Sequence, residues 1–246
     1  MNRAIVLDAL SALTCATVKD RAQPGSPGLD LSELTVQNFV SSALLPLILS
    51  KDEPSRAEPE TEPDERTELF VDINNFLAPS FDYDFRNLND SSECTRGGEP
   101  YTRPCGWYRF ALKVVNKYPD GNAWLGPGGW RNESAAGEWP VSYHATGRPS
   151  EGNQRAEFGI FSTPNIVAAQ QDEQMVKEFE KDGQRYRVMM QNRINPAERV
   201  RLNDDLWLVK VPLDLYALEE ERRREELKKL LDRSIRPYGI LIRQID

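Results

Sequence analysis

Three short segments in the C-terminal half carry the residues whose types and order could do chemistry. Tyr143-His-Ala-Thr146 ends a predicted strand and contains the only histidine of the chain. Gly159-Ile-Phe-Ser-Thr-Pro164 follows after a short loop, and Asp204-Asp-Leu-Trp-Leu-Val209 opens a later strand with a carboxylate. Each segment alone has a plainer structural explanation, in strand ends, core and turns. Their joint order, with a histidine, an aromatic residue and an acid each on a strand, is what suggests a site.

This order resembles the poly(ADP-ribose) polymerase-like ADP-ribosyltransferases. In that family a Tyr/Leu-His-Gly-Thr/Ser segment, a Gly-Ile-Tyr-Phe segment and a strand-borne Glu surround NAD. The sequence is also similar to a group of eukaryotic proteins with the pattern Trp-Pro-Val-Ser-Tyr-His-Gly-Thr. The resemblance is local: it covers roughly residues 139–246 and rests on motifs that are individually short.

The resemblance implies a role for each motif residue, with NAD as a substrate. Of the three catalytic residues, His144 would hydrogen-bond a ribose hydroxyl, Phe161 would stack on the nicotinamide ring, and Asp205 would bond the ribose and stabilise positive charge. The backbone of Ala145 would grip the nicotinamide carboxamide. The residues implied to line the NAD site are Tyr143, Ala145, Thr146, Gly159 and Ser162.

The chemistry explains why such residues would be used. Cleavage of nicotinamide from NAD passes through an oxocarbenium-like state, as glycoside hydrolysis does, with positive charge building on the ribose. A site for this reaction must hold the leaving group, orient the ribose and stabilise the developing charge. A carboxylate, an aromatic ring and a hydrogen-bonding imidazole supply these three needs.

Three positions depart from the family pattern and keep several functions open. Ala145 stands for Gly, Phe161 for Tyr and Asp205 for Glu, and the acidic position could instead be Asp204. On the resemblance, an Asp predicts transfer of a single ADP-ribose to a protein side chain rather than polymer growth. The alternative is a catalytically inactive protein that binds a protein or ADP-ribose. A third possibility, RNA 2′-phosphotransfer, would need a basic cleft.

Composition restricts the function classes. With 31 basic and 39 acidic residues the chain has a net charge of −8, which argues against a general affinity for nucleic acid. Three scattered cysteines and one histidine argue against a His/Cys metal centre. Cys94 and Cys105 could in principle form a disulfide, but we expect the cysteines to be free thiols. No segment resembles a signal peptide or a membrane span. We expect a soluble intracellular protein, cytoplasmic or nuclear, of undetermined oligomeric state, whose partner is a protein.

Periodicity predicts an α+β domain over residues 69–246, with a split antiparallel or mixed sheet of the ADP-ribosyltransferase type. Strands are predicted at 107–115, 139–146, 159–163, 184–194, 206–211 and 238–245, and a helix at 214–234. In the first strand, alternation places Arg109 and Lys113 on the face opposite Tyr108, Phe110 and Leu112.

The N-terminal part reads differently. Residues 1–50 form a predicted helical segment, with helices at 3–19 and 31–49 and with Ser32 or Thr35 as the N-cap of the second. Residues 51–68 are rich in Pro and acidic residues and are predicted to be a linker.

Two further segments have no assigned role. The Trp124-Leu-Gly-Pro-Gly-Gly-Trp130 loop could pack against the sheet, which is the simpler expectation, or form an aromatic surface for a partner. The polar strand end Gln191-Asn-Arg-Ile-Asn-Pro196 could line the cleft or face solvent.

Overall fold

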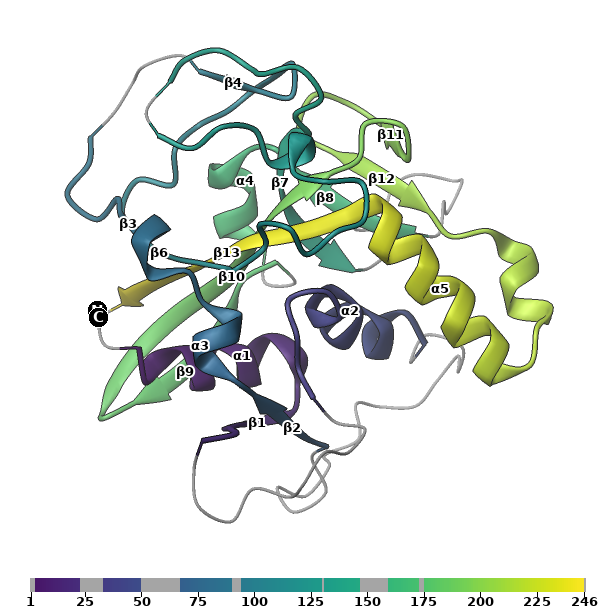
Figure 1. Ribbon diagram of the computed structural model, residues 1–246, viewed down its shortest axis with the longest axis horizontal. Coiled ribbons are helices and arrows are strands. Elements are labelled where there is room, and N and C mark those ends of the chain that lie inside the picture. Colours follow the sequence, from purple (N-terminus) through teal and green to yellow (C-terminus); the bar gives the residue numbers. More distant parts are fainter. Residues whose placement is uncertain are drawn as a thin grey trace.

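A large sheet forms the centre of the protein. The computed structural model (Figure 1) describes residues 3–22, 33–49, 67–89, 94–129, 131–146, 159–172 and 175–245, and for Leu47, His144, Ala145 and Thr146 it describes the backbone alone. Five α-helices lie in these ranges: α1 Ile5–Thr14, α2 Phe39–Leu49, α3 Ile73–Phe76, α4 Ile166–Gln171 and α5 Glu220–Ser234. The strands are β1 Thr17–Asp20, β2 Glu68–Val71, β3 Tyr83–Asp84, β4 Thr95–Arg96, β5 Glu99–Pro100, β6 Tyr108–Ala111, β7 Val141–Thr146, β8 Gly159–Thr163, β9 Lys177–Lys181, β10 Gln184–Ile194, β11 Arg199–Arg201, β12 Trp207–Lys210 and β13 Ile235–Ile245.

The sheet has the strand order β11-β12-β8-β7-β10-β13-β6-β3, and β9 pairs with β10 off this path. Every pairing in this sheet is antiparallel. The long strands β10 and β13 run side by side in its middle, with a register shift at Gln191/Asn192. The predicted α+β class and the mostly antiparallel sheet are therefore confirmed.

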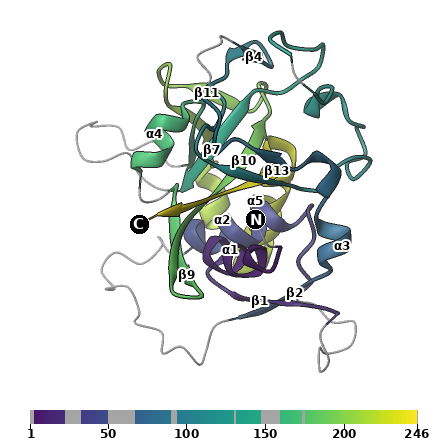
Figure 2. The ribbon, with the colours of Figure 1, turned by 90° about the vertical axis from the view of Figure 1, so that its left-hand side faces the viewer.

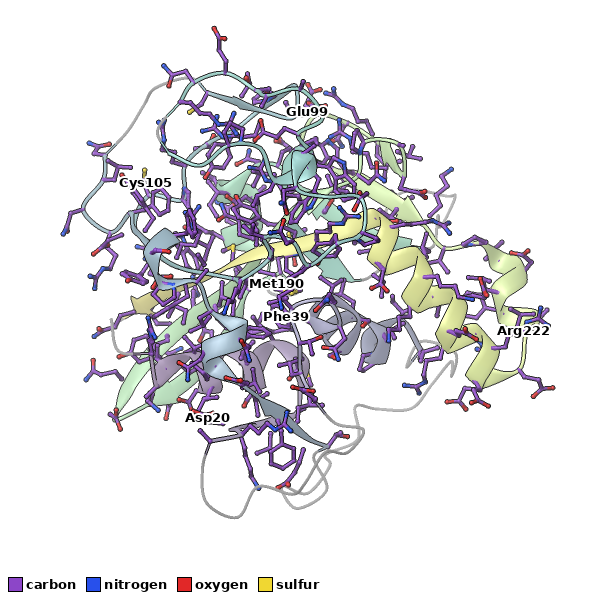
Figure 3. All side chains as sticks on the ribbon, in the orientation of Figure 1. Asp20, Phe39, Glu99, Cys105, Met190 and Arg222 are labelled. Carbon is purple, nitrogen blue, oxygen red and sulfur yellow. The ribbon has the colours of Figure 1, made fainter. Side chains whose placement is uncertain are left out.

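Helices cover one face of the sheet and a loop-rich layer covers the other. In Figures 1 and 2, α1, α2 and α5 lie together beneath β10 and β13, while the loops around β4 lie on the opposite side. Phe39 of α2 and Met190 of β10 are both buried and lie close to the middle of the molecule (Figure 3). Both layers contribute to the buried hydrophobic residues, since Phe39 of α2 and Trp124 of the loop layer belong to the same buried cluster.

The N-terminal helices belong to the same core as the sheet. The buried positions of α1 are Ile5, Val6, Ala9, Leu10, Leu13 and Thr14, a helical spacing that turns one stripe towards β9 and β10. The sequence predicts residues 1–50 as a segment apart from the α+β domain, whereas in the structure both contribute to one contiguous set of buried side chains. Of the predicted linker, residues 51–66 lie outside the described residues, and Glu68 already begins β2.

The first predicted helix ends earlier than expected. Cys15 follows α1 in the left-handed conformation, with φ of 53°, and Thr17–Asp20 then forms β1, which pairs in parallel with β2. The prediction of a helix over 3–19 is wrong for its last turn because this strand pairing competes with helical propensity. The N-cap candidate Ser32 lies outside the described residues. Thr35 and Asn38 exchange two hydrogen bonds of 2.7 and 3.2 Å in the turn before α2.

The strands that carry the site agree well with the prediction. β8 and β10 have the predicted bounds, and β6, β7 and β12 lie within the predicted ranges. The predicted helix over 214–234 divides into a 3₁₀ turn at Leu213–Ala217 and α5, because the backbone is extended at Leu218 and Glu219. None of the described helices is long and apolar enough to cross a bilayer.

Candidate functional site

The three motif segments lie on neighbouring strands. β7, which ends in Tyr143–Thr146, pairs with β8, and β8 pairs with β12 on its other side. Across these strands His144 lies opposite Ser162, and Ser162 lies opposite Trp207. Phe161 lies in the next row, between Ala145 and Leu208. The fold therefore brings the predicted histidine and aromatic segments into direct register, although they are separated by a loop in the sequence.

Asp205 lies at the end of this strand group, where β8 leaves the sheet. Its carboxylate accepts a hydrogen bond of 3.1 Å from Nδ2 of Asn165, the residue that caps α4 directly after β8. Its backbone N–H donates to Oδ1 of Asn203, 2.9 Å away, in the tight turn between β11 and β12. Asp204 instead points outward, with a side chain that is 98% exposed and paired with Arg201. Of the two candidate acids, Asp205 is the one held against the β8 end.

Burial separates the remaining predicted site residues. Tyr143, Phe161 and Ser162 are all less than 5% exposed. Burial raises the pKa of Tyr143 well above its usual value, and its hydroxyl lies 3.4 Å from Nε2 of Gln191. The Ser162 hydroxyl is buried and has no hydrogen-bond partner among the described residues. Phe161 therefore occupies a core position, and stacking on a ligand would require its ring to be uncovered.

Gly159 has a packing reason that needs no ligand. A Cβ atom at this position would lie 2.3 Å from the carbonyl oxygen of Val209 and 2.6 Å from a methyl group of Leu208. Only a glycine lets β8 approach β12 this closely. The side chains of His144, Ala145 and Thr146, to which the resemblance assigns ligand contacts, lie outside what the structure describes.

A charged cluster fixes the strands beside Asp205. Glu99, on the β4–β5 hairpin, pairs with Arg199 and Arg201 of β11, and its side chain is 10% exposed. The Arg199 guanidinium lies 3.9 Å from the centre of the Trp207 ring, a cation–π contact. Arg201 also bonds Asp204. The hairpin thus holds the β11–β12 turn, and with it Asp205, in place.

A cavity of about 890 Å³ lies on the loop-covered face of the sheet, away from the motif strands. Its walls come from the 3₁₀ turn at Pro79–Phe81, from β6 and from the loop Gly126–Gly129, with Arg193 and Tyr238 also lining it. Six basic side chains line it and no carboxylate does so among the described residues: Arg96, Arg103, Arg109, Lys113, Arg131 and Arg193. None of the predicted site residues contributes to its wall.

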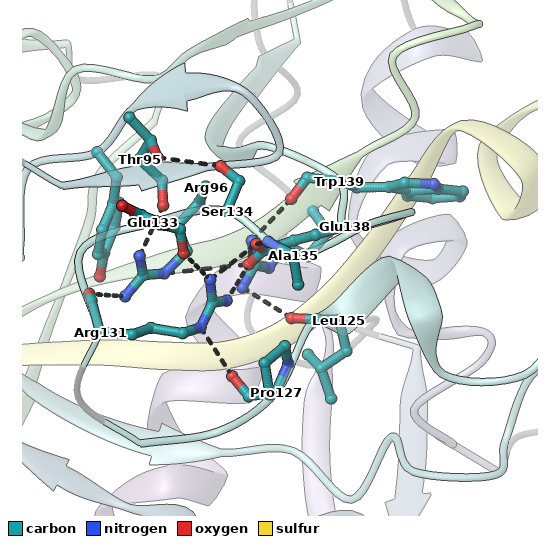
Figure 4. Close-up of polar contacts among 12 residues, drawn as sticks. Thr95, Arg96, Leu125, Pro127, Arg131, Glu133, Ser134, Ala135, Glu138 and Trp139 are labelled. Atoms are coloured by element: carbon teal, nitrogen blue, oxygen red, sulfur yellow. Dashed lines mark hydrogen bonds and ion pairs between the residues drawn. The ribbon is translucent and has the colours of Figure 1, made fainter.

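One buried carboxylate holds three of these arginines. Glu138 has a fully buried side chain and contacts Arg131, Arg193 at 2.9 Å and Arg96 at 4.0 Å (Figure 4). Burial alone would raise the pKa of Glu138, but hydrogen bonds from Arg131 and Ala135 and the charge of Arg193 outweigh it, so the pKa lies below its usual value. Three guanidiniums against one carboxylate leave an excess of positive charge beside the cavity.

The sequence did not predict this cavity, although two of its patterns include residues that line it. Alternation put Arg109 and Lys113 on one face of the strand, and that face lines the cavity. The polar strand end 191–196 supplies Arg193, which is 5% exposed and faces the cavity rather than bulk solvent. In the tryptophan loop, Trp124 is buried against Tyr118 and Trp139, as the packing expectation required. Trp130 lies outside the described residues.

Neither a metal site nor a similar protein indicates a function for the described residues. In the described ranges no three His, Cys, Asp or Glu side chains gather as a metal site, and Cys15, Cys94 and Cys105 form no disulfide bond. Comparison of the chain with protein-family models, with curated proteins and with solved structures finds no match.

Proposed function

We propose that the chain is a NAD-dependent mono-ADP-ribosyltransferase-like protein that modifies a protein side chain. The observation that supports this proposal is the adjacency of the three motif strands in the order β12-β8-β7. This order sets the His144 segment beside the Phe161 segment and holds Asp205 at the end of β8 through Asn165. His144, Phe161 and Asp205 stand at the positions where the resemblance places a His, a Tyr and a Glu around NAD.

In this reaction the bond between the ribose C1′ and the nicotinamide nitrogen breaks, and the electron pair leaves with nicotinamide. The nucleophile of the acceptor side chain then forms a bond to C1′ and releases its proton to solvent. Asp205 is the proposed stabiliser of the oxocarbenium-like charge, because its exposed carboxylate can approach a ribose. His144 is the proposed hydrogen-bond partner of a ribose hydroxyl.

The second candidate is a catalytically inactive protein that binds ADP-ribose or a protein through the same strands. Two observations favour it. Phe161 is 4% exposed, so its ring is not free to stack on nicotinamide, and the Asp205 carboxylate already accepts a hydrogen bond from Asn165. RNA 2′-phosphotransfer finds less support. The basic cavity is lined by no residue of β7, β8 or β12, so it does not give the motif residues a basic cleft.

The test is NAD binding by calorimetry together with nicotinamide release, in the wild type and in Asp205→Asn, Asp204→Asn and His144→Ala. Transfer predicts that Asp205→Asn lowers the rate of nicotinamide release by roughly 100-fold or more, since it removes a group that stabilises developing charge. The matched control Asp204→Asn should keep the wild-type rate, because Asp204 points into solvent. His144→Ala should weaken both NAD binding and release.

Two results would contradict the proposal. A rate that falls in Asp204→Asn and not in Asp205→Asn would show that the acid is wrongly assigned. NAD that neither binds nor is consumed at millimolar concentration would exclude transfer. Binding of ADP-ribose without NAD turnover would then support the inactive binding protein.

A further inference from the structure

The cavity on the loop-covered face concentrates positive charge in a chain that is acidic overall. Six basic side chains line it, while the chain carries a net charge of −8. Glu138 balances only part of this charge, because it is a single carboxylate shared by three arginines. Burying excess positive charge is costly without a counter-charge. The cavity therefore favours an anionic ligand.

Among these cations Arg109 is the one best placed to receive that ligand. Arg96, Arg131 and Arg193 each donate to backbone carbonyls and contact Glu138, so most of their hydrogen-bonding capacity is used. Arg109 donates once, to the carbonyl of Phe81 at 3.1 Å. Its Nε is buried without a hydrogen-bond partner among the described residues. The carboxylate of Asp82 accepts a hydrogen bond from the backbone N–H of Ala111 and interacts with Arg109 through its charge rather than through a hydrogen bond.

Aromatic rings orient the Arg109 guanidinium. It lies 5.6 Å from the centre of the Phe85 ring and 5.7 Å from that of Tyr238, both of which line the cavity. The stem of Arg109 packs over Gly239, where a Cβ would come within 2.8 Å of it. A guanidinium fixed in this way is pre-organised to bind a phosphate oxygen.

The mouth of the cavity presents flat apolar surface. Phe81 is 57% exposed and Tyr83 is 38% exposed, and both line the opening. Phe81 faces the glycine loop, since a Cβ on Gly128 would lie 3.9 Å from the edge of its ring. Exposed rings beside a cationic wall are the combination that holds nucleobases, which stack on aromatic side chains while their phosphates meet cations.

We propose that this cavity binds a nucleoside phosphate, with its phosphate at Arg109 and its base against Phe81 and Tyr83. Lys113, exposed at the rim, adds positive potential at the entrance. A volume of about 890 Å³ lies within the range of small-molecule sites and exceeds the needs of inorganic phosphate alone. This site is independent of the proposed transferase function, because its wall contains no residue of the three motif strands.

The test is calorimetric titration of the full chain with AMP, with adenosine and with inorganic phosphate as separate probes. The proposal predicts that AMP binds more tightly than either component, because both halves of the site are engaged. Arg109→Gln should weaken AMP binding roughly tenfold or more. The exposed Arg222→Gln on α5, at the right-hand edge of Figure 3 and not part of the cavity wall, should leave AMP binding unchanged. Phe81→Ala, at an exposed position, tests the base half if Arg109→Gln fails to fold.

The variant Asp205→Asn distinguishes the motif site from the cavity, because it should lower the rate of nicotinamide release roughly 100-fold or more and leave AMP binding intact. The proposal is overturned if AMP does not bind at millimolar concentration. It is equally overturned if AMP binds Arg109→Gln and Phe81→Ala as tightly as the wild type. Loss of AMP binding in Asp205→Asn alone would place the nucleotide at the motif strands and contradict the cavity site.

Discussion

Glu138 has an unusual position for a carboxylate, because its side chain is completely buried and touches three arginines from separate segments. Arg96 comes from β4, Arg131 from the loop between the 3₁₀ turn at Ala123–Leu125 and β7, and Arg193 from β10. Leu125 and Trp139 accept hydrogen bonds from Arg193 through their backbone carbonyls. One side chain thus joins the loop layer to the sheet, and its removal would leave several cations without a counter-charge.

We expect Glu138→Gln to lower the free energy of unfolding by about 3 kcal/mol or more at pH 7, because breaking a buried ion pair from one side leaves uncompensated charge. Urea denaturation followed by fluorescence would measure this change. The control Glu221→Gln removes the same charge from the exposed face of α5 and should cost less than about 0.5 kcal/mol.

The stability that Glu138 contributes should depend on pH in a direction set by its lowered pKa. The folded-state pKa of Glu138 lies below its ordinary value of 4.5, so the carboxylate stabilises the fold in full above pH 4.5. That contribution is lost as the pH falls through the folded-state pKa. The difference in stability between wild type and Glu138→Gln should therefore shrink on acidification below pH 4.5. A difference that stays constant down to the acid unfolding range would contradict the ion-pair role.

The helix α1 shows how strongly an N-terminal element can be committed to the sheet. Its apolar stripe packs on β9 and β10, and Asp8 forms an ion pair of 2.5 Å with Lys181 of β9. That ion pair is partly exposed, so most of the stabilisation comes from the buried stripe. Leu10, at the centre of the stripe, is completely buried.

Leu10→Ala should lower the free energy of unfolding by about 2–5 kcal/mol, the range for a leucine truncated in a tightly packed core. The matched control is Leu213→Ala, since Leu213 is 76% exposed and its truncation should change stability by less than about 0.5 kcal/mol. Chemical denaturation of both variants gives the comparison. Equal, small effects would mean that α1 adds little to the fold.

The sequence predicted correctly those strands that can be recognised from their own residues and the turns beside them. β8 and β10 each have an apolar centre, Ile160–Phe161 and Val188–Met190, and turn-forming residues on each side, so their limits agree with the sequence. β1 could not be predicted in this way, because its four residues follow α1 directly and its partner β2 lies beyond residues 51–66. A strand that depends on a distant partner leaves little trace in its own sequence.

The common core of helices and sheet makes a direct prediction about dividing the chain. A fragment of residues 67–246 loses β1, α1 and α2 and exposes the apolar surface that they cover, so alone it should show no cooperative unfolding transition. Co-expression with a separate fragment of residues 1–50 should restore a soluble complex, because β1 can again pair with β2. Affinity purification through a tag on one fragment, followed by thermal denaturation, tests both statements.

Cooperative unfolding of residues 67–246 alone would contradict this prediction. It would show that the helices at the N-terminus are dispensable for folding, and the division at residue 69 drawn from sequence would then describe the molecule better than a single core does.

The two candidate sites differ in how much of each could be predicted from the sequence. The motif residues could be selected from the sequence, because a histidine, an aromatic residue and an acid each fall on a predicted strand. The structure was needed only to show the register of these strands. The basic cavity assembles Arg96, Arg109 and Arg193 from three separate parts of the chain. The separation of these arginines in the sequence gives no sign that they lie together in the folded protein. Neither the cavity nor the contact of Glu138 with three arginines could therefore be derived from the sequence.

The position of β13 has a consequence for biosynthesis. It is the last strand of the sheet in chain order, yet it lies between β10 and β6 and joins the two parts of the sheet. During translation these two parts cannot meet until the residues of β13 have left the ribosome, and both keep open edges until then. Open edges are the usual starting points of aggregation. A nascent chain of this protein is therefore expected to need chaperone protection until β13 has emerged.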